Sequence, residues 1–243
     1  VLAGCVMPEL YGRVNHATVE VLGAIGFEVH VPREHVCCGA LHAHNGELDG
    51  ALELARTTIA SFERYGDAPV VVNSAGCGAH MKGYGHLLRD DAQWKERAQR
   101  FARRVVDFSE FVAARAPVDW QPKLDAAFGT LTYDDPCHLC HGQQVRAEPR
   151  ALLDLVAKAQ RVDMHEPEAC CGSAGLYSLL RPADSQAVFA AKLSAFDASG
   201  ADVLVTANPG CHLQWQTGFA RAGRDARVVH IAEVLAEASR ARP

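Results

Sequence analysis

The sequence predicts an α/β protein made of two tandem repeats, each a small parallel sheet flanked by helices and related to the other by pseudo-two-fold symmetry. Two observations carry this prediction. The cysteine pattern matches itself when the chain is shifted by 132 to 134 residues, and β-prone and helical segments alternate in the same order in both halves. The matching pairs are Cys5 with Cys137, Cys37 with Cys170, Cys38 with Cys171, and Cys77 with Cys211.

Each repeat is expected to open with a short β-prone run that ends at a cysteine. These runs are residues 1–5 and 131–137. A helix is expected next, over residues 15–25 in one copy and 149–159 in the other, because apolar side chains recur there with helical spacing. The first cysteine of each copy should therefore lie in the turn between a strand and a helix.

Two further strands are expected in each repeat. Residues 27–31 and 161–165 lead through a proline into the Cys-Cys-Gly triplet. After another helix, the apolar runs that begin at Val70 and Val203 are typical of buried parallel strands, and each delivers the last cysteine of its copy. The cysteines thus fall at the carboxyl ends of strands, which is where ligands bind in such sheets.

The two copies also close alike, with residues 105–114 corresponding to 228–238. The first copy carries an additional helical stretch near residues 91–104, and the prolines of residues 117–122 indicate a linker. The expected organisation is residues 1–116 for the first cysteine-rich repeat, 117–122 for the linker, and 123–243 for the second cysteine-rich repeat.

Composition narrows the class of protein. The 243 residues are 49% apolar and carry a net charge of −5 with acids and bases interspersed, which argues against a nucleic-acid partner. The sequence has neither a membrane-spanning apolar run nor a signal peptide, so we expect a cytoplasmic protein, or one held at the inner face of the cell membrane by a complex. The chain opens without Met, on what looks like the end of a strand, so we expect a piece of a longer polypeptide.

Nine cysteines in a reducing compartment point to metal or redox chemistry rather than to disulfides, since an odd number cannot all pair within one chain. An iron-sulfur cluster needs several thiolates at one place, and each repeat offers four. Four thiolates satisfy structural zinc equally well, although zinc usually binds Cys-x-x-Cys pairs that these positions lack. Buried, inert thiols are the ordinary alternative for any single cysteine.

Other motifs near the cysteines carry less information. Four histidines are near them in sequence and are candidates for hydrogen-bond donors or surface residues: His80, His138, His141 and His212. The sequence Gly172-Ser173-Ala174-Gly175 suggests a phosphate-binding loop but has no Walker lysine. No Ser/His/Asp order or carboxylate pair stands out, so no catalytic residue is predicted.

Two Cys-Cys-Gly triplets, each with an upstream cysteine and a downstream Gly-Cys, resemble the cysteine-rich (CCG) domain pair. That pair occurs in heterodisulfide reductase B subunits, lactate-utilisation iron-sulfur proteins and the iron-sulfur subunit of glycolate oxidase. Five segments are most similar to the glycolate oxidase type: residues 38–44, 73–78, 135–138, 170–175 and 208–211.

The resemblance implies an iron-sulfur electron-transfer subunit of a glycolate or other 2-hydroxy-acid oxidase. A flavoprotein dehydrogenase subunit would oxidise the substrate, and this subunit would relay electrons toward a membrane acceptor such as a quinone. In that family a ferredoxin-like segment with two four-iron clusters precedes the pair, and this chain lacks its Cys-x-x-Cys-x-x-Cys run. We therefore expect that segment on another polypeptide or upstream, and we expect no glycolate oxidation by this chain alone.

One departure from the family pattern affects the expected ligands. The family ends each copy with Cys-x-x-Cys, but Ser74 and Asn208 occupy the first of these positions here. We therefore expect one four-iron (4Fe-4S) cluster per repeat, or zinc, rather than a non-cubane cluster. Ser74, Asn208 and the unmatched Cys140 are additional candidate ligands. The expected ligands are Cys5, Cys37, Cys38 and Cys77 in one repeat and Cys137, Cys170, Cys171 and Cys211 in the other.

Two other functions remain open from the sequence. One is a catalytic subunit that reduces a heterodisulfide or a quinone at the cluster. The other is a zinc-stabilised module that docks the flavoprotein without carrying electrons.

Overall fold

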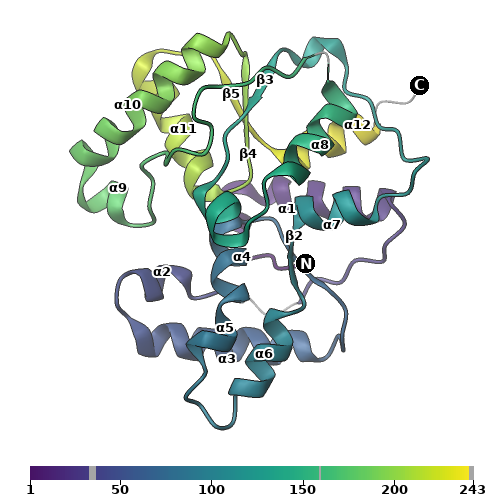
Figure 1. Ribbon diagram of the computed structural model, residues 1–243, viewed down its shortest axis with the longest axis vertical. Coiled ribbons are helices and arrows are strands. Elements are labelled where there is room, and N and C mark those ends of the chain that lie inside the picture. The colour runs from purple at the N-terminus through teal and green to yellow at the C-terminus, as the bar shows by residue number, and fades with distance from the viewer. Residues whose placement is uncertain (33–36, 159, 241–243) are drawn as a thin grey trace.

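The computed structural model describes residues 1–32, 37–158 and 160–240, and it contains two small parallel sheets flanked by helices (Figure 1). In one sheet β1 (Val70–Val72) pairs with β2 (Val105–Asp107). In the other, β4 (Val203–Thr206) lies between β3 (Leu131–Tyr133) and β5 (Arg227–His230). The predicted α/β class with one parallel sheet in each half is confirmed.

Helices flank both sheets, and every strand is followed by a helix. In the first half of the chain the helices are α1 (Val6–Ala24), α2 (Ala40–His44), α3 (Leu48–Glu63), α4 (Ala75–Lys82), α5 (Tyr84–Leu87), α6 (Lys95–Ala102) and α7 (Phe108–Arg115). In the second half they are η1 (Ala126–Phe128), the π-helical η2 (His138–Gln143), α8 (Ala147–Ala157), α9 (Tyr177–Leu180), α10 (Pro182–Ser199), α11 (Pro209–Ala222) and α12 (Ile231–Arg240). Within the described parts of the chain, no helix is both long and apolar enough to cross a bilayer.

The sequence accounts for these elements locally. Every residue of β1 and β4 is buried, as expected for parallel strands that helices cover on both sides. Asp107 ends β2 and caps α7 in a capping box with Glu110, which satisfies main-chain N–H groups at the start of that helix. Gly200 ends α10 in the left-handed conformation, with φ of 69°. Each short strand is thus followed closely by a helix, and the turns between strands and helices carry residues of the candidate site.

One hydrophobic core crosses between the two repeats. In Figure 1, α1 and α7 lie beside α12 and α8, and α1 packs against α12 while α7 packs against α8. Val14 and Val21 of α1 belong to the same buried cluster as Leu153 of α8 and Ile231 and Leu235 of α12. This shared helical layer holds the two sheets, and the turns at their ends, in a fixed relation.

Three predicted strands are wrong within the described residues. Residues 1–5 form no strand, because Gly4 turns the chain with φ of 78°, although the Leu2 N–H donates to the Val71 oxygen at 3.0 Å. Residues 27–31 belong to no strand. In residues 161–165, Arg161 makes one isolated bridge with Leu131. Local β-propensity does not specify a pairing neighbour, so these two segments remain outside the sheets apart from that bridge.

Candidate iron-sulfur site

The first thiol set consists of Cys5, Cys37, Cys38 and Cys77. The Sγ atoms of Cys5 and Cys37 are 3.4 Å apart, and Cys38 hydrogen-bonds to both Cys37 and Cys77. Hydrogen bonds from Cys38 and Cys5, together with one from the Gly39 N–H, lower the pKa of Cys37 to about 2. The structure therefore brings together all four cysteines that the repeat predicts for this half.

The second thiol set consists of Cys137, Cys170, Cys171 and Cys211. Cys170 hydrogen-bonds to Cys137 and Cys171, and Cys171 in turn to Cys211. The first two bonds lower the pKa of Cys170 to about 2, and the Gly172 N–H adds to the effect. The order of sulfur contacts repeats that of the first set. Cys170 is exposed, whereas Cys171 and Cys211 are buried.

A glycine in the left-handed conformation follows each cysteine pair and aims a main-chain N–H at sulfur. Gly39 has φ of 80° and donates to Cys37 Sγ at 3.5 Å, and Gly172 has φ of 84° and donates to Cys170 Sγ at 3.4 Å. A Cβ on Gly172 would lie 2.5 Å from the main-chain oxygen of Ser185. Both the backbone conformation and the space therefore require glycine at this position.

The last cysteine of each set lies in the first turn of a helix that follows a strand. Cys77 is near the start of α4 and Cys211 near the start of α11. The positive end of a helix dipole and its free N–H groups favour a thiolate there. Hydrogen bonding from Cys38, with a contribution from the Ser74 hydroxyl, lowers the pKa of Cys77.

Ser74 and Asn208 lie beside the thiols, and each hydrogen-bonds to the last cysteine of its own set. Ser74 bonds to Cys77 within the first repeat. The Asn208 Nδ2 donates to Cys211 Sγ at 3.5 Å, and the Asn208 Oδ1 accepts from the Gly76 N–H at 3.1 Å. These contacts satisfy both ends of the amide.

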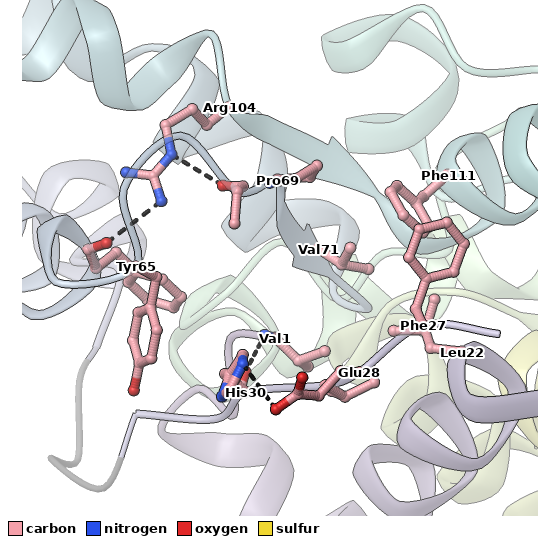
Figure 2. A pocket seen from close by; sticks show the side chains of 13 residues that line it. Val1, Leu22, Phe27, Glu28, His30, Tyr65, Pro69, Val71, Arg104 and Phe111 are labelled. Atoms are coloured by element: carbon pink, nitrogen blue, oxygen red, sulfur yellow. Dashed lines mark hydrogen bonds and ion pairs between the residues drawn. The ribbon is translucent and has the colours of Figure 1, made fainter.

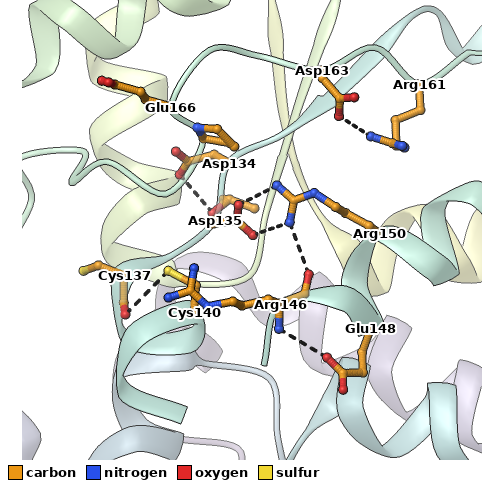
Figure 3. A network of polar contacts seen from close by, with 12 residues as sticks. Asp134, Asp135, Cys137, Cys140, Arg146, Glu148, Arg150, Arg161, Asp163 and Glu166 are labelled. Carbon is orange, nitrogen blue, oxygen red and sulfur yellow. Dashed lines mark hydrogen bonds and ion pairs between the residues drawn. The ribbon is translucent and has the colours of Figure 1, made fainter. Parts of the chain in front are cut away.

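Cys140, the ninth cysteine, is buried in η2 and is drawn in Figure 3. Its Sγ faces the main-chain oxygen of Cys137 at 3.9 Å, and burial raises the pKa of its thiol. In the same view Arg150 makes a two-pronged ion pair with Asp135, at 2.6 and 2.8 Å. That pair ties the turn after β3 to α8, so it fixes the place from which Cys137 projects.

The histidines named from the sequence separate into different environments. His138 Nδ1 is 3.9 Å from Cys137 Sγ, and its ring stacks on His44, with 5.5 Å between centroids. His44 is also 6.3 Å from the ring of His80, and burial lowers the pKa of His80 to about 4. The ring of His212 instead packs at a tilt against Tyr11, and His141 contacts Arg146. His44, which motif reasoning passed over, thus joins the two repeats.

A buried ion pair that the sequence does not predict lies next to the second thiol set. Lys192 Nζ lies 2.7 Å from Asp134 Oδ1, and both side chains are almost completely buried. Desolvation raises the pKa of Asp134 despite this partner. Hydrogen bonds with Cys170 and Cys211, and burial, raise the pKa of Cys171, and the Asp134 carboxylate adds to that effect. The Asp-Asp-Pro-Cys motif contains one member of the pair, but nothing in the sequence of α10 marks Lys192.

A cavity of about 170 Å³ lies elsewhere in the first repeat and is shown in Figure 2. Apolar side chains such as Phe27, Val71 and Phe111 line it, together with His30 and Arg104. None of the described cysteines contributes to its wall. The cavity is therefore separate from the thiol sets.

The donor chemistry of both sets fits an iron-sulfur cluster. Each offers four free thiols, a helix N-terminus and a main-chain N–H to sulfur, which are the features that bind and tune such clusters. Neighbouring thiols within each set are linked by hydrogen bonds. Among the described residues, no three His, Cys, Asp or Glu side chains are placed to hold a single metal ion.

Comparison with known proteins agrees with the repeat and the cysteine pattern. The family model of the cysteine-rich domain, CCG, matches residues 1–82 and 131–216. A probable glycolate oxidase iron-sulfur subunit of Bacillus subtilis (strain 168) is 39% identical over 242 residues, which is 98% of this chain and 54% of that protein. Lactate utilization protein A of Bacillus cereus (strain B4264) is 32% identical over 235 residues, or 95% of each chain.

The chain therefore spans about half of the Bacillus subtilis protein and nearly all of lactate utilization protein A. The two matched segments contain the first and the second thiol set in full, together with Ser74 and Asn208. With two copies of the domain, each carrying its own Cys-Cys-Gly triplet, the chain belongs to the cysteine-rich (CCG) domain family.

Proposed function

We propose that this chain is the iron-sulfur electron-transfer subunit of a complex that oxidises glycolate or a related 2-hydroxy acid. The observation that carries the proposal is the presence of two matching sets of four thiols, each backed by a glycine N–H and a helix N-terminus. The names of the relatives support it, because they refer to an iron-sulfur subunit of glycolate oxidase and to lactate utilisation.

In this proposal the first and the second thiol set each hold one four-iron (4Fe-4S) cluster. Such a cluster, when bound, supplies reversible one-electron transfer. The residues of the chain hold the thiolates in place, donate hydrogen bonds to their sulfurs and keep water away. Burial of Cys38, Cys171 and Cys211 supports the last role.

A partner must supply the chemistry at the substrate carbon, since electrons leave a hydroxy acid through a flavin or a comparable cofactor. We therefore assign substrate oxidation to a flavoprotein subunit, and electron acceptance to a quinone or other membrane acceptor. A ferredoxin-like segment or subunit with four-iron clusters would complete the relay. Cys170 is exposed, so the second thiol set is the one expected to face a partner.

The test is electron transfer in a mixture of purified components. The chain, purified without oxygen, should show broad visible absorption that dithionite bleaches, and it should be reduced by the flavoprotein subunit only when the hydroxy acid is present. Without the flavoprotein we expect no substrate oxidation. Turnover by the chain alone would contradict the proposal, as would a colourless protein that contains zinc.

A further inference from the structure

The Asn208 side chain touches both repeats. Its Nδ2 donates to Cys211 Sγ at 3.5 Å, within the second thiol set. Its Oδ1 accepts from the main-chain N–H of Gly76 at 3.1 Å, and Gly76 immediately precedes Cys77 of the first thiol set. One side chain therefore links the turns that carry the last cysteine of each set.

The surroundings fix this side chain in one orientation. An N–H group can only donate, so the amide oxygen must face Gly76 and the amide nitrogen must face the thiol. A Cβ on Gly76 would lie 3.4 Å from Oδ1, and a Cβ on Gly210 would lie 3.3 Å from Nδ2. The Ala75 N–H also donates to the Ala207 oxygen at 3.1 Å, which joins the same two turns through the main chain.

The matching residue of the first repeat behaves differently. Ser74 hydrogen-bonds to Cys77, so it supports a thiol of its own repeat as Asn208 supports Cys211. The longer Asn208 side chain carries in addition the acceptor that reaches Gly76 across the repeat boundary. The two positions share the thiol contact, and the bridge comes from the asparagine.

From this geometry we infer that Asn208 is a positioning residue that couples the two thiol sets, and that it is not a ligand. Its nitrogen supports Cys211, and its oxygen holds the turn before Cys77. The inference rests on the proposed function in one respect, namely that the sets hold clusters whose potentials can be measured. Hydrogen bonds to cluster sulfurs tune the potential, and losing a donor makes the cluster harder to reduce.

Three substitutions separate the two halves of the bridge. Asn208→Ser keeps a donor of the kind that Ser74 provides but is too short to reach Gly76. Asn208→Asp keeps the oxygen that accepts from Gly76 and loses the donor to Cys211. Asn208→Ala loses both, and Ser74→Ala is the matched control because it removes a thiol contact within one repeat.

The acceptor half is measured by hydrogen exchange of the peptide that covers residues 73–78. Losing one hydrogen bond of about 1 kcal/mol should make the Gly76 amide exchange about fivefold faster. We expect this acceleration in Asn208→Ala and Asn208→Ser, and wild-type exchange in Asn208→Asp. Equal exchange in the wild type and Asn208→Ala would overturn the bridge.

The donor half is measured by redox titration of each centre, followed by electron paramagnetic resonance. The second centre should become harder to reduce in Asn208→Ala, and it should remain close to wild type in Asn208→Ser. Ser74→Ala should affect the first centre alone. Unchanged potentials in Asn208→Ala, or loss of iron in that variant with recovery in Asn208→Asp, would contradict a positioning role. Absence of iron from the wild type would refute the proposed function instead, while the exchange experiment would still test the bridge.

Discussion

Replacing Gly172 by alanine should strongly destabilise the second repeat. The left-handed backbone costs an alanine about 1 kcal/mol, and its Cβ would lie 2.5 Å from the main-chain oxygen of Ser185. Relieving that overlap moves the turn or the start of α10, at about 1 kcal/mol or more. It also weakens the bond of 2.8 Å from Ser185 Oγ to the Gly172 oxygen, which contributes about 1 kcal/mol. We expect the free energy of unfolding to fall by about 3 kcal/mol.

Two other glycines provide graded controls. A Cβ on Gly39 would lie 3.2 Å from the Ala51 oxygen, so Gly39→Ala should cost about 2 kcal/mol. Gly200 has φ of 69°, but a Cβ on it would meet no other described part of the chain within 4 Å, so Gly200→Ala isolates the backbone strain of about 1 kcal/mol.

The assay is urea denaturation of the three variants without oxygen, followed by far-ultraviolet circular dichroism, with iron measured per chain. We expect the loss of stability to increase from Gly200→Ala through Gly39→Ala to Gly172→Ala. Iron loss should accompany the last two. A Gly172→Ala variant as stable as Gly200→Ala would refute the explanation based on the close approach to Ser185.

Three further predictions concern the thiols and the buried charges. Cys171→Ser should empty the second centre and leave the first loaded, whereas Cys140→Ser should change iron content little. Loss of iron from both centres of a still-folded Cys171→Ser variant, or unchanged iron in it, would contradict independent sets. Lys192→Met should lower the free energy of unfolding, measured by urea denaturation, by about 3 to 5 kcal/mol, because it leaves the buried Asp134 carboxylate without its ion-pair partner. Adding Asp134→Asn should recover most of that loss. Burial raises the pKa of Asp107 to about 6 from 3.8, so the folded state binds the extra proton and stability should fall as pH rises across that window. Asp107→Asn should remove about 3 kcal/mol of this pH dependence while keeping the helix cap, and identical pH profiles would disprove the assignment.

The repeat, the sheets and the composition of the thiol sets could be predicted from the sequence because each leaves a local or periodic signal. Apolar runs indicated β1 and β4, and the matching cysteines of the two copies indicated which thiols belong to each set. The strands expected over residues 27–31 and 161–165 failed because pairing depends on a neighbour that local propensity does not reveal.

Contacts between distant segments were beyond sequence reasoning for the same reason. Lys192 is an ordinary residue of α10 until the fold places it against Asp134. Asn208 looks like a substituted ligand, and only the approach of the Gly76 turn reveals its acceptor role. The stacking of His44 on His138 likewise requires the two repeats to meet.

Iron and acid-labile sulfide, measured together with zinc on the chain purified without oxygen, test the central claim most directly. One four-iron cluster in each thiol set predicts about eight irons and about eight sulfides per chain, with no stoichiometric zinc. Zinc bound at the thiols without acid-labile sulfide would contradict the account.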